Sequence, residues 1–288
     1  MQSVLSQSEA AADPPPAAGP ARLTIAISTL GSRLARIDAQ ALPAQAGWRY
    51  LILVQATGSA EPPVALAARP DIAWLTLDTT GVAASRNRAL DAATTEYLLF
   101  SDDDIELLAD GIGRLVAAFD ARPDLAVLTA QTLNGDGTPL KAYARRARRL
   151  SLFNSAKTGT VEMMVRPARI RQQAVRFNTA FGVGTRLPLG DEYVFIADCL
   201  KAGLRGRYVP IPVAVHTARS SGNDWLSAES AEARARVFDT VFGPLSLPIK
   251  LLFLVRHWGE FRSVAQFLAY SRVMMRSAGR ATAPSARK

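Results

Sequence analysis

The chain has 288 residues, of which 49% are apolar and 20% are charged, a length and composition that suit one large folded domain with an appendage. One cysteine, Cys199, and two histidines exclude an intramolecular disulfide framework and a structural zinc site, and they fit a reducing cytosol. The net charge of +9 favours an anionic partner: a phosphate-bearing substrate, an acidic lipid surface or a nucleic acid.

Residues 1–20 are rich in alanine and proline and have neither a basic start nor an apolar core. This composition is typical of a disordered leader and not of a signal peptide. No later stretch reaches the roughly 18–20 uninterrupted apolar residues of a membrane-spanning helix, so the sequence predicts no such helix.

Strand-like and helix-like segments alternate from residue 22 onward. Apolar runs predict strands at residues 22–28, 48–54, 72–77, 97–100 and 125–130. Helical spacing predicts helices at residues 31–40, 81–93 and 111–121. The short connections between these segments indicate an α/β fold with a mostly parallel, doubly wound sheet flanked by helices.

The apolar run at residues 97–100 stops abruptly at three carboxylates, Asp102, Asp103 and Asp104. Ligands of open α/β sheets bind outside the carboxyl ends of the strands, which is where these acids fall. Adjacent carboxylates repel one another unless a cation, a basic side chain or backbone amides neutralise them. A solvated acidic turn that caps the next helix is the alternative, but the abrupt change favours a Mg²⁺ or Mn²⁺ site with oxygen ligands.

The alternating pattern breaks after residue 131. Residues 141–153 contain five basic side chains within nine positions, for which a solvated helix face is a simpler explanation than a contact surface. A strand is predicted at residues 161–165, a helix at 190–203 and an extended segment at 207–215 that ends at His216. Cys199 lies on the apolar side of the predicted helix and is expected in the core.

Beyond residue 225 the sequence predicts a helical extension, with one helix at residues 228–241, a break at Pro244 and Pro248, and a second helix from residue 249. Five apolar residues are expected on one side of that second helix: Leu251, Leu254, Trp258, Phe261 and Leu268. Basic residues are expected on its other sides: Lys250, Arg256, Arg262, Arg272 and Arg276. Two explanations stay open, a helix on an anionic membrane surface and a helix packed on its own domain or on a partner.

Four motifs occur in the order and approximate spacing of a known family. They are residues 81–90 (GVAASRNRAL), 100–104 (FSDDD), 190–192 (GDE) at the start of a helix, and 209–210 (VP) shortly before His216. The chain from about residue 23 to residue 225 thereby resembles the family 2 glycosyltransferases, which have the GT-A fold, use nucleotide sugars and mostly invert the anomeric centre. The resemblance implies a Rossmann-like GT-A domain at residues 21–225, between the leader 1–20 and the extension 226–288.

The resemblance also implies roles for single residues. Asp102 and Asp104 match the DxD motif, which holds Mn²⁺ or Mg²⁺ against the donor diphosphate, where the metal is a Lewis acid for the departing nucleotide. His216 matches a third metal ligand, with a backbone-bonded strand-end histidine as the alternative. The positions that match donor-binding parts of the family are Ser28, Thr29, Gly58, Ser59, Arg86, Asn87 and Asp103. For Arg86 an ordinary surface arginine is the alternative, and for Asp103 a cap of the next helix.

An inverting transfer needs a carboxylate that takes the proton of the acceptor hydroxyl. Asp191 and Glu192 lie in a first helical turn, where the helix dipole favours carboxylates even without a catalytic role. Glu192 matches the family's base position and is preferred over Asp191. The sequence departs from the family in the reversed order of these two acids and in Gln55, which stands where the family has aspartates that contact the nucleobase.

These patterns together predict a metal-dependent, hexosyltransferase-like enzyme. It would move a sugar from a UDP-sugar to a saccharide or lipid-linked acceptor in cell-surface polysaccharide or glycolipid synthesis. We expect it in the cytoplasm, with peripheral contact to the anionic inner face of the cell membrane, and with no nucleic acid as partner. The alternatives are a nucleotidyltransferase on a similar sheet and a non-catalytic basic module that binds nucleic acid or membrane.

Overall fold

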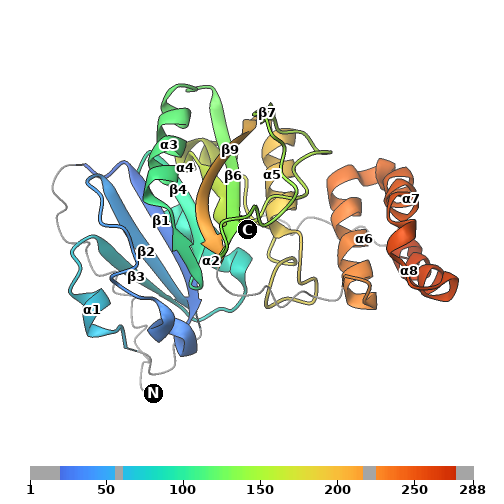
Figure 1. The fold of residues 1–288 in the computed structure, drawn as a ribbon, viewed down its shortest axis with the longest axis horizontal. Helices are drawn as coiled ribbons and strands as arrows, with labels where there is room; N and C mark the ends of the chain where they lie inside the picture. Colours follow the sequence, from blue (N-terminus) through green and yellow to red (C-terminus); the bar gives the residue numbers. More distant parts are fainter. Residues whose placement is uncertain (1–19, 56–60, 217–224, 277–288) are drawn as a thin grey trace, which may run out of the picture.

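The computed structural model describes residues 20–55, 61–216 and 225–276 (Figure 1). The leader predicted at residues 1–20 therefore lies almost wholly outside the described residues. The described chain forms one large sheet with helices on both faces and a group of helices at one end. This is the α/β architecture with a helical extension that the sequence predicts.

The strands of the sheet lie in the order β3-β2-β1-β4-β8-β6-β9-β5, and β7 pairs with β9. Their bounds are β1 Leu23–Leu30, β2 Trp48–Gln55, β3 Ile72–Leu77, β4 Tyr97–Asp102, β5 Ile105–Leu107, β6 Leu125–Asn134, β7 Arg148–Arg149, β8 Met163–Val165 and β9 Arg205–His216. Strands β3, β2, β1 and β4 are parallel, and so are β6 and β9. The short β8 lies antiparallel between β4 and β6, which makes the sheet mixed but mostly parallel.

The helices of the main domain cover both faces of the sheet. They are α1 Val64–Ala67, α2 Val82–Ala92, α3 Ala109–Asp120, α4 Pro167–Gln172 and α5 Asp191–Lys201, with short 3-10 helices η1 Gly31–Arg36 and η2 Thr160–Glu162. Successive residues of a strand point to opposite faces, so Leu99 of β4 packs in the core under α3 while Leu98 packs in the core under α2 and α5. Cys199 lies fully buried in the second core, as predicted.

Two local predictions were wrong, and one alternative is excluded. The helix expected at residues 31–40 is only the 3-10 helix η1. The basic segment 141–153 is not helical, since its only regular element is β7, which pairs with β9. The acid triplet does not cap the next helix, because β5 lies between the triplet and α3.

The C-terminal extension contains α6 Ala228–Phe242, η3 Gly243–Leu245, α7 Ser246–Arg256, η4 Trp258–Glu260 and α8 Val264–Arg276. The second helix expected from residue 249 is thus broken after Arg256, so its five apolar residues do not share one helix face. Lys250 was expected on a polar side, but it is fully buried and its Nζ donates to Asp239 Oδ1 at 2.6 Å. The buried pair joins α7 to α6.

An 18-residue window within Ala228–Arg256 has a mean hydropathy of 1.5, so this stretch could cross a membrane by length and composition alone. Charged residues such as Asp239 and Lys250 interrupt the stretch, so it contains no uninterrupted apolar run of roughly 18–20 residues. In the structure the stretch turns at η3, and α6 and α7 pack against each other as separate helices (Figure 1).

α6 is also packed on the main domain. Val237 and Val241 of α6 share a core with Tyr193 and Val194 of α5. A Cβ atom at Gly190, the residue that precedes α5, would lie 2.4 Å from Val237, so only glycine allows α6 to approach this closely. The extension therefore covers the beginning of α5.

Two glycines of α3 provide a matched test of how closely α3 packs on β9. A Cβ atom at Gly111 would lie 1.8 Å from the carbonyl oxygen of Pro212 in β9, whereas one at Gly113 would meet nothing within 4 Å. We expect Gly111→Ala to destabilise the fold by about 1–3 kcal/mol through overpacking. Gly113→Ala should stabilise it by about 0.5–1 kcal/mol because alanine loses less backbone entropy in a helix. Thermal unfolding measures both, and an unchanged melting temperature for Gly111→Ala would contradict the contact between α3 and β9.

Candidate active site

The carboxyl ends of β1 and β4 bring polar residues together at one edge of the sheet. Asp102, the last residue of β4, lies opposite Ser28 of β1 in the strand register. The hydroxyl of Ser28 is hydrogen-bonded to that of Ser85 in α2 at 2.7 Å. The acid triplet therefore begins where β1, β4 and α2 meet.

The middle acid of the triplet is turned inward and the outer two are more open. Asp103 has 5% of its side chain exposed and accepts hydrogen bonds from Thr29 and Arg33, each at 2.5 Å. Asp102 and Asp104 keep 39% and 36% of their side chains exposed. Arg33 also approaches Asp104 at 3.4 Å. Thr29 and Asp103 thus support the triplet from within, and two carboxylates remain accessible for a ligand.

Arg86 of α2 is the centre of the site. It is buried, and its guanidinium contacts Asp191, Glu192 at 3.5 Å and Asp102 at 3.8 Å. It also lies 5.8 Å from the centre of the Phe177 ring. The alternative of a surface arginine is therefore wrong, and the guanidinium is engaged by carboxylates of this chain.

Asp191 and Glu192 begin α5 and differ in their environment. Asp191 has 4% of its side chain exposed, and it fits because Gly182 opposite has no Cβ atom, which would lie 2.9 Å from the carboxyl carbon. Glu192 has 20% of its side chain exposed and accepts a hydrogen bond from the hydroxyl of Thr160 in η2. Glu192 is the more accessible of the two acids.

The pKa values of the two acids shift in opposite directions. Burial and the neighbouring Glu192 raise the pKa of Asp191 to about 7, against the effect of Arg86. For Glu192, burial acts to raise the pKa, but the Arg86 charge and the Thr160 hydroxyl hold it below its usual range. At neutral pH Glu192 is thus the ionised acid, whereas Asp191 is protonated in about half of the molecules.

Three carboxylates surround one guanidinium, so the cluster has an excess of negative charge when all are ionised. Partial burial, with the nearby acids, raises the pKa of Asp102 in spite of Arg86. A divalent cation would relieve this excess. Mg²⁺ is typically held by one or two carboxylates together with substrate phosphates, and the open pair Asp102 and Asp104 fits that arrangement.

The structure does not assemble the three-residue metal set that the sequence predicts. Within residues 20–55, 61–216 and 225–276, no group of three His, Cys, Asp or Glu side chains is placed to hold a metal ion. His216 ends β9 opposite Ile105 in the strand register, so its backbone lies beside the acid triplet. Asp102 and Asp104 are therefore the better candidates, and His216 as a third ligand stays a prediction.

The side chains of Asn87, a predicted donor-binding residue, and of Gln55 make hydrogen bonds within the protein. The side-chain amide of Asn87 makes two hydrogen bonds with the backbone of Phe177, at 2.8 and 2.9 Å, and so holds that segment on α2. Gln55 is buried and donates one of its two amide N–H groups to the Gly81 carbonyl at 2.9 Å. Gly58 and Ser59 lie outside the described residues.

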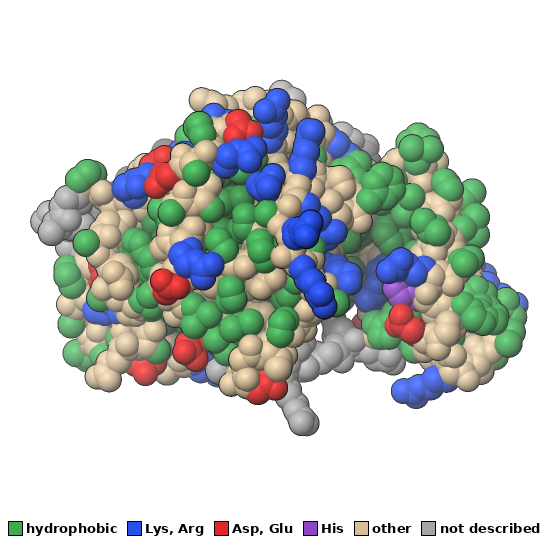
Figure 2. Space-filling model, turned by 45° about the horizontal axis from the view of Figure 1, so that its top comes forward, with side chains coloured by type: hydrophobic (Ala, Val, Ile, Leu, Met, Phe, Trp, Pro, Cys, Tyr) green, Lys and Arg blue, Asp and Glu red, His purple; other side chains and the backbone are tan. Residues whose placement is uncertain are grey.

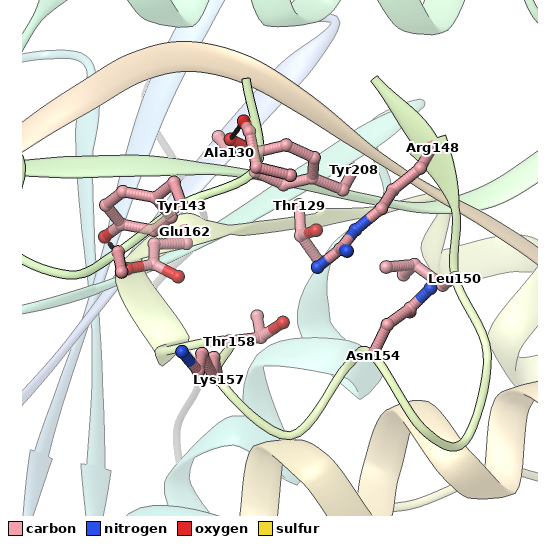
Figure 3. Close-up of a pocket in the computed structure, with 12 residues that line it drawn as sticks. Thr129, Ala130, Tyr143, Arg148, Leu150, Asn154, Lys157, Thr158, Glu162 and Tyr208 are labelled. Carbon is pink, nitrogen blue, oxygen red and sulfur yellow. Dashed lines mark hydrogen bonds between the residues drawn. The ribbon is translucent and has the colours of Figure 1, made fainter. Parts of the chain in front are cut away.

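A hollow beside η2 is visible in Figure 3. Its lining includes Tyr143, Glu162, Arg148 and Lys157, and Glu162 accepts a hydrogen bond from the Tyr143 hydroxyl at 2.6 Å. Its volume is about 30 Å³. This space holds one or two water molecules and is far below the roughly 300 Å³ of small-molecule sites, so the hollow is not a donor site in this conformation.

Two residues of the site were not predicted. Arg33 follows β1, and the rule that parallel strands end at one edge could have placed it near the acid triplet. Thr160 reaches Glu192 across 32 positions of the chain, and no sequence pattern signals that contact.

The raised pKa of Asp191 predicts a pH dependence of stability. The folded state holds a proton that the unfolded chain releases near its ordinary pKa of about 4, so this stabilisation is complete below about pH 4 and is lost as the pH rises to about 7. We expect the melting temperature to fall between about pH 5 and about pH 8, and to fall less in Asp191→Asn. Asp110→Asn, at an acid that is 90% exposed, is the control. Equal slopes for all three proteins would contradict the raised pKa.

Comparisons with known proteins agree with this fold. Residues 58–187 match the model of glycosyl transferase family 2, a segment that contains Arg86 and the acid triplet. No curated protein matches the chain. The solved structure of residues 1–349 of S. aureus TarS is similar over 90% of this chain and 81% of that one, with a TM-score of 0.63 and 14% identity.

The complexes of the same TarS fragment are similar as well. The complex with UDP-GlcNAc has a TM-score of 0.60 and 15% identity, over 89% of this chain and 81% of that one. The complex with UDP has a TM-score of 0.57 and 17% identity, over 84% and 72%. These likenesses concern the fold, and together with the family match they show that the chain carries a glycosyltransferase family 2 domain with a GT-A-like fold.

Proposed function

We propose that this chain transfers a sugar from a UDP-sugar to a hydroxyl acceptor with inversion of the anomeric centre. The observation that carries the proposal is the cluster around Arg86. It brings the acids at the end of β4 within reach of the acids at the beginning of α5. One pair of acids can serve the donor diphosphate, and the other can take a proton from the acceptor. The UDP and UDP-GlcNAc complexes of TarS support a UDP-sugar as the donor class.

On the donor side, Asp102 and Asp104 are the residues that would hold Mn²⁺ or Mg²⁺. A divalent ion there would neutralise charge on the diphosphate as it leaves. Asp103, Thr29 and Arg33 fix the backbone of the triplet from the inside. Ser28 lies beside Asp102 and is the β1 residue best placed to contact the donor.

On the acceptor side, we assign the base to Glu192. The acceptor oxygen forms a bond to the anomeric carbon while the bond from that carbon to the diphosphate oxygen breaks, and the hydroxyl proton moves to the carboxylate. Glu192 supports this role by its exposure and by its lowered pKa, which keeps it ionised. Asp191, buried against Arg86, then positions the guanidinium and the beginning of α5.

The acceptor is proposed as a saccharide or a lipid-linked sugar on the cytoplasmic side of the cell membrane, in the synthesis of a cell-surface polysaccharide or glycolipid. The two alternative functions receive less support. A nucleotidyltransferase would need a free basic loop after β1, and Arg33 of that loop is engaged by Asp103 and Asp104. A non-catalytic nucleic-acid module leaves the exposed acids of the triplet without a purpose.

The donor assignment is tested by nucleotide binding. We expect UDP to raise the melting temperature of the wild type in the presence of Mn²⁺ and much less in its absence. At a ligand concentration of about 100 times Kd the stabilisation is about 2.7 kcal/mol. Asp104→Asn should lose the metal-dependent part, while Asp110→Asn, an exposed acid on α3, should keep it. Metal-dependent UDP binding of normal strength in Asp104→Asn would refute the assignment.

The base assignment is tested by two near-isosteric changes. Glu192→Gln should retain UDP-sugar binding but lower the transfer rate by about 10²–10⁴-fold, the usual contribution of general base catalysis. Asp191→Asn should lower it less and mainly reduce stability. Transfer can be followed as UDP release with the acceptor, or as slow donor hydrolysis without one. The roles are exchanged if only Asp191→Asn loses transfer, or if the wild-type rate rises with pH through about 7, the pKa of Asp191.

A further inference from the structure

The polarity of α7 is the reverse of that of an ordinary surface helix. Its lysine, Lys250, is fully buried, whereas four large apolar side chains point outward: Leu247 at 49% exposure, Leu251 at 51%, Leu252 at 62% and Val255 at 73%. A single exposed leucine is normal for a soluble protein, but a buried charge together with an exposed apolar face is not. The outward side of α7 is therefore built for contact with something apolar.

The apolar residues of α7 are part of a larger surface. Among the described parts of the chain, twelve large hydrophobic side chains are exposed, and eight of them lie between residues 245 and 268. They are Leu245, Leu247, Leu251, Leu252, Val255, Trp258, Val264 and Leu268, and we call them the α7–α8 apolar face. Figure 2 shows hydrophobic side chains gathered along the outer side of this helical lobe. Contiguous apolar surface of this kind marks an interaction site.

The charges around the apolar face are mostly positive. The segment 245–276 contains four exposed arginines, Arg256, Arg262, Arg272 and Arg276, and a single acid, Glu260. Along α8, Val264, Leu268, Arg272 and Arg276 follow one another at four-residue intervals, so each lies beside the next in a strip that winds slowly around the helix. That strip is apolar at its beginning and basic at its end.

We propose that the α7–α8 apolar face docks on the surface of an anionic lipid bilayer. The leucines, Val255 and Trp258 would enter the boundary between headgroups and acyl chains. The flanking arginines would contact lipid phosphates, which attract basic side chains near an anionic surface. The proposal goes beyond the transfer reaction and does not depend on it.

Two features favour a bilayer surface over the other occupants. A symmetric dimer through this face would place the same arginines of two copies near one another, and like charges at an interface are unfavourable. A spanning arrangement would need α6 and α7 to form one straight helix in lipid. α6 instead buries Ala231, Ala235, Val237 and Val241 against α5 and α8 and carries the acid that pairs with Lys250.

Vesicle flotation of the full chain tests the proposal. We expect binding to phosphatidylcholine vesicles that contain about one quarter phosphatidylglycerol, and weaker binding to pure phosphatidylcholine or at high salt. The double variant Leu251→Gln, Leu252→Gln should bind at least about tenfold more weakly. Val64→Gln is its control, since Val64 is 86% exposed on α1, away from the face.

The double variant Arg272→Gln, Arg276→Gln should lose about tenfold or more of the binding to anionic vesicles and little of the binding to neutral ones. Arg114→Gln, at an exposed position of α3, is its control. Melting temperatures close to that of the wild type would show that all variants are folded. Wild-type binding that the leucine variant retains would overturn the proposal. So would absence of vesicle binding together with self-association that the leucine variant abolishes, a result that would assign the face to a second copy of the chain.

Discussion

A single buried guanidinium determines the geometry of the candidate site. Removing Arg86 from water is costly, and only close carboxylates offset the loss of hydration. Those carboxylates come from the end of β4 and from the beginning of α5, elements that are far apart in the sequence and meet only in the folded sheet. Because the ion cluster is stable in one arrangement, the ends of β4, α2 and α5 must keep their relative positions. The acids that we propose for the donor and the acceptor are thereby held at a fixed separation.

The segment before α5 supports the same cluster from the other side. Asn87, one residue after Arg86, holds the backbone of Phe177, and the Phe177 ring stacks on Phe195 of α5 with 4.0 Å between centroids. Gly182 then leaves the space that Asp191 fills. The helix α2 thus uses two neighbouring residues for two purposes: Arg86 for charge and Asn87 for backbone position. Substitution of either would disturb both acids of α5.

Much of the fold could be predicted because its signals are local. The strand predicted at residues 72–77 has the observed bounds of β3, and the predicted helix at 81–93 differs by one residue at each end from α2. The predictions failed where distant contacts decide. β8 enters the sheet antiparallel between β4 and β6, Lys250 turns inward because Asp239 of another helix receives it, and Arg86 meets Asp191 across 105 positions. The acids and Arg86 were each predicted in the site from the sequence, but the contacts between them were not.

The contact between Gly190 and Val237 bears on how such enzymes change during evolution. A module that is joined to its neighbour only by a linker can be exchanged, duplicated or lost without effect on the rest. Here α6 rests on the residue that precedes Asp191, and it shares a core with the first turns of α5. Loss of the C-terminal helices would expose that core to water and free the beginning of α5. The extension and the acids of α5 are therefore bound to be inherited together, and a relative with a different C-terminal region must cover this surface by other means.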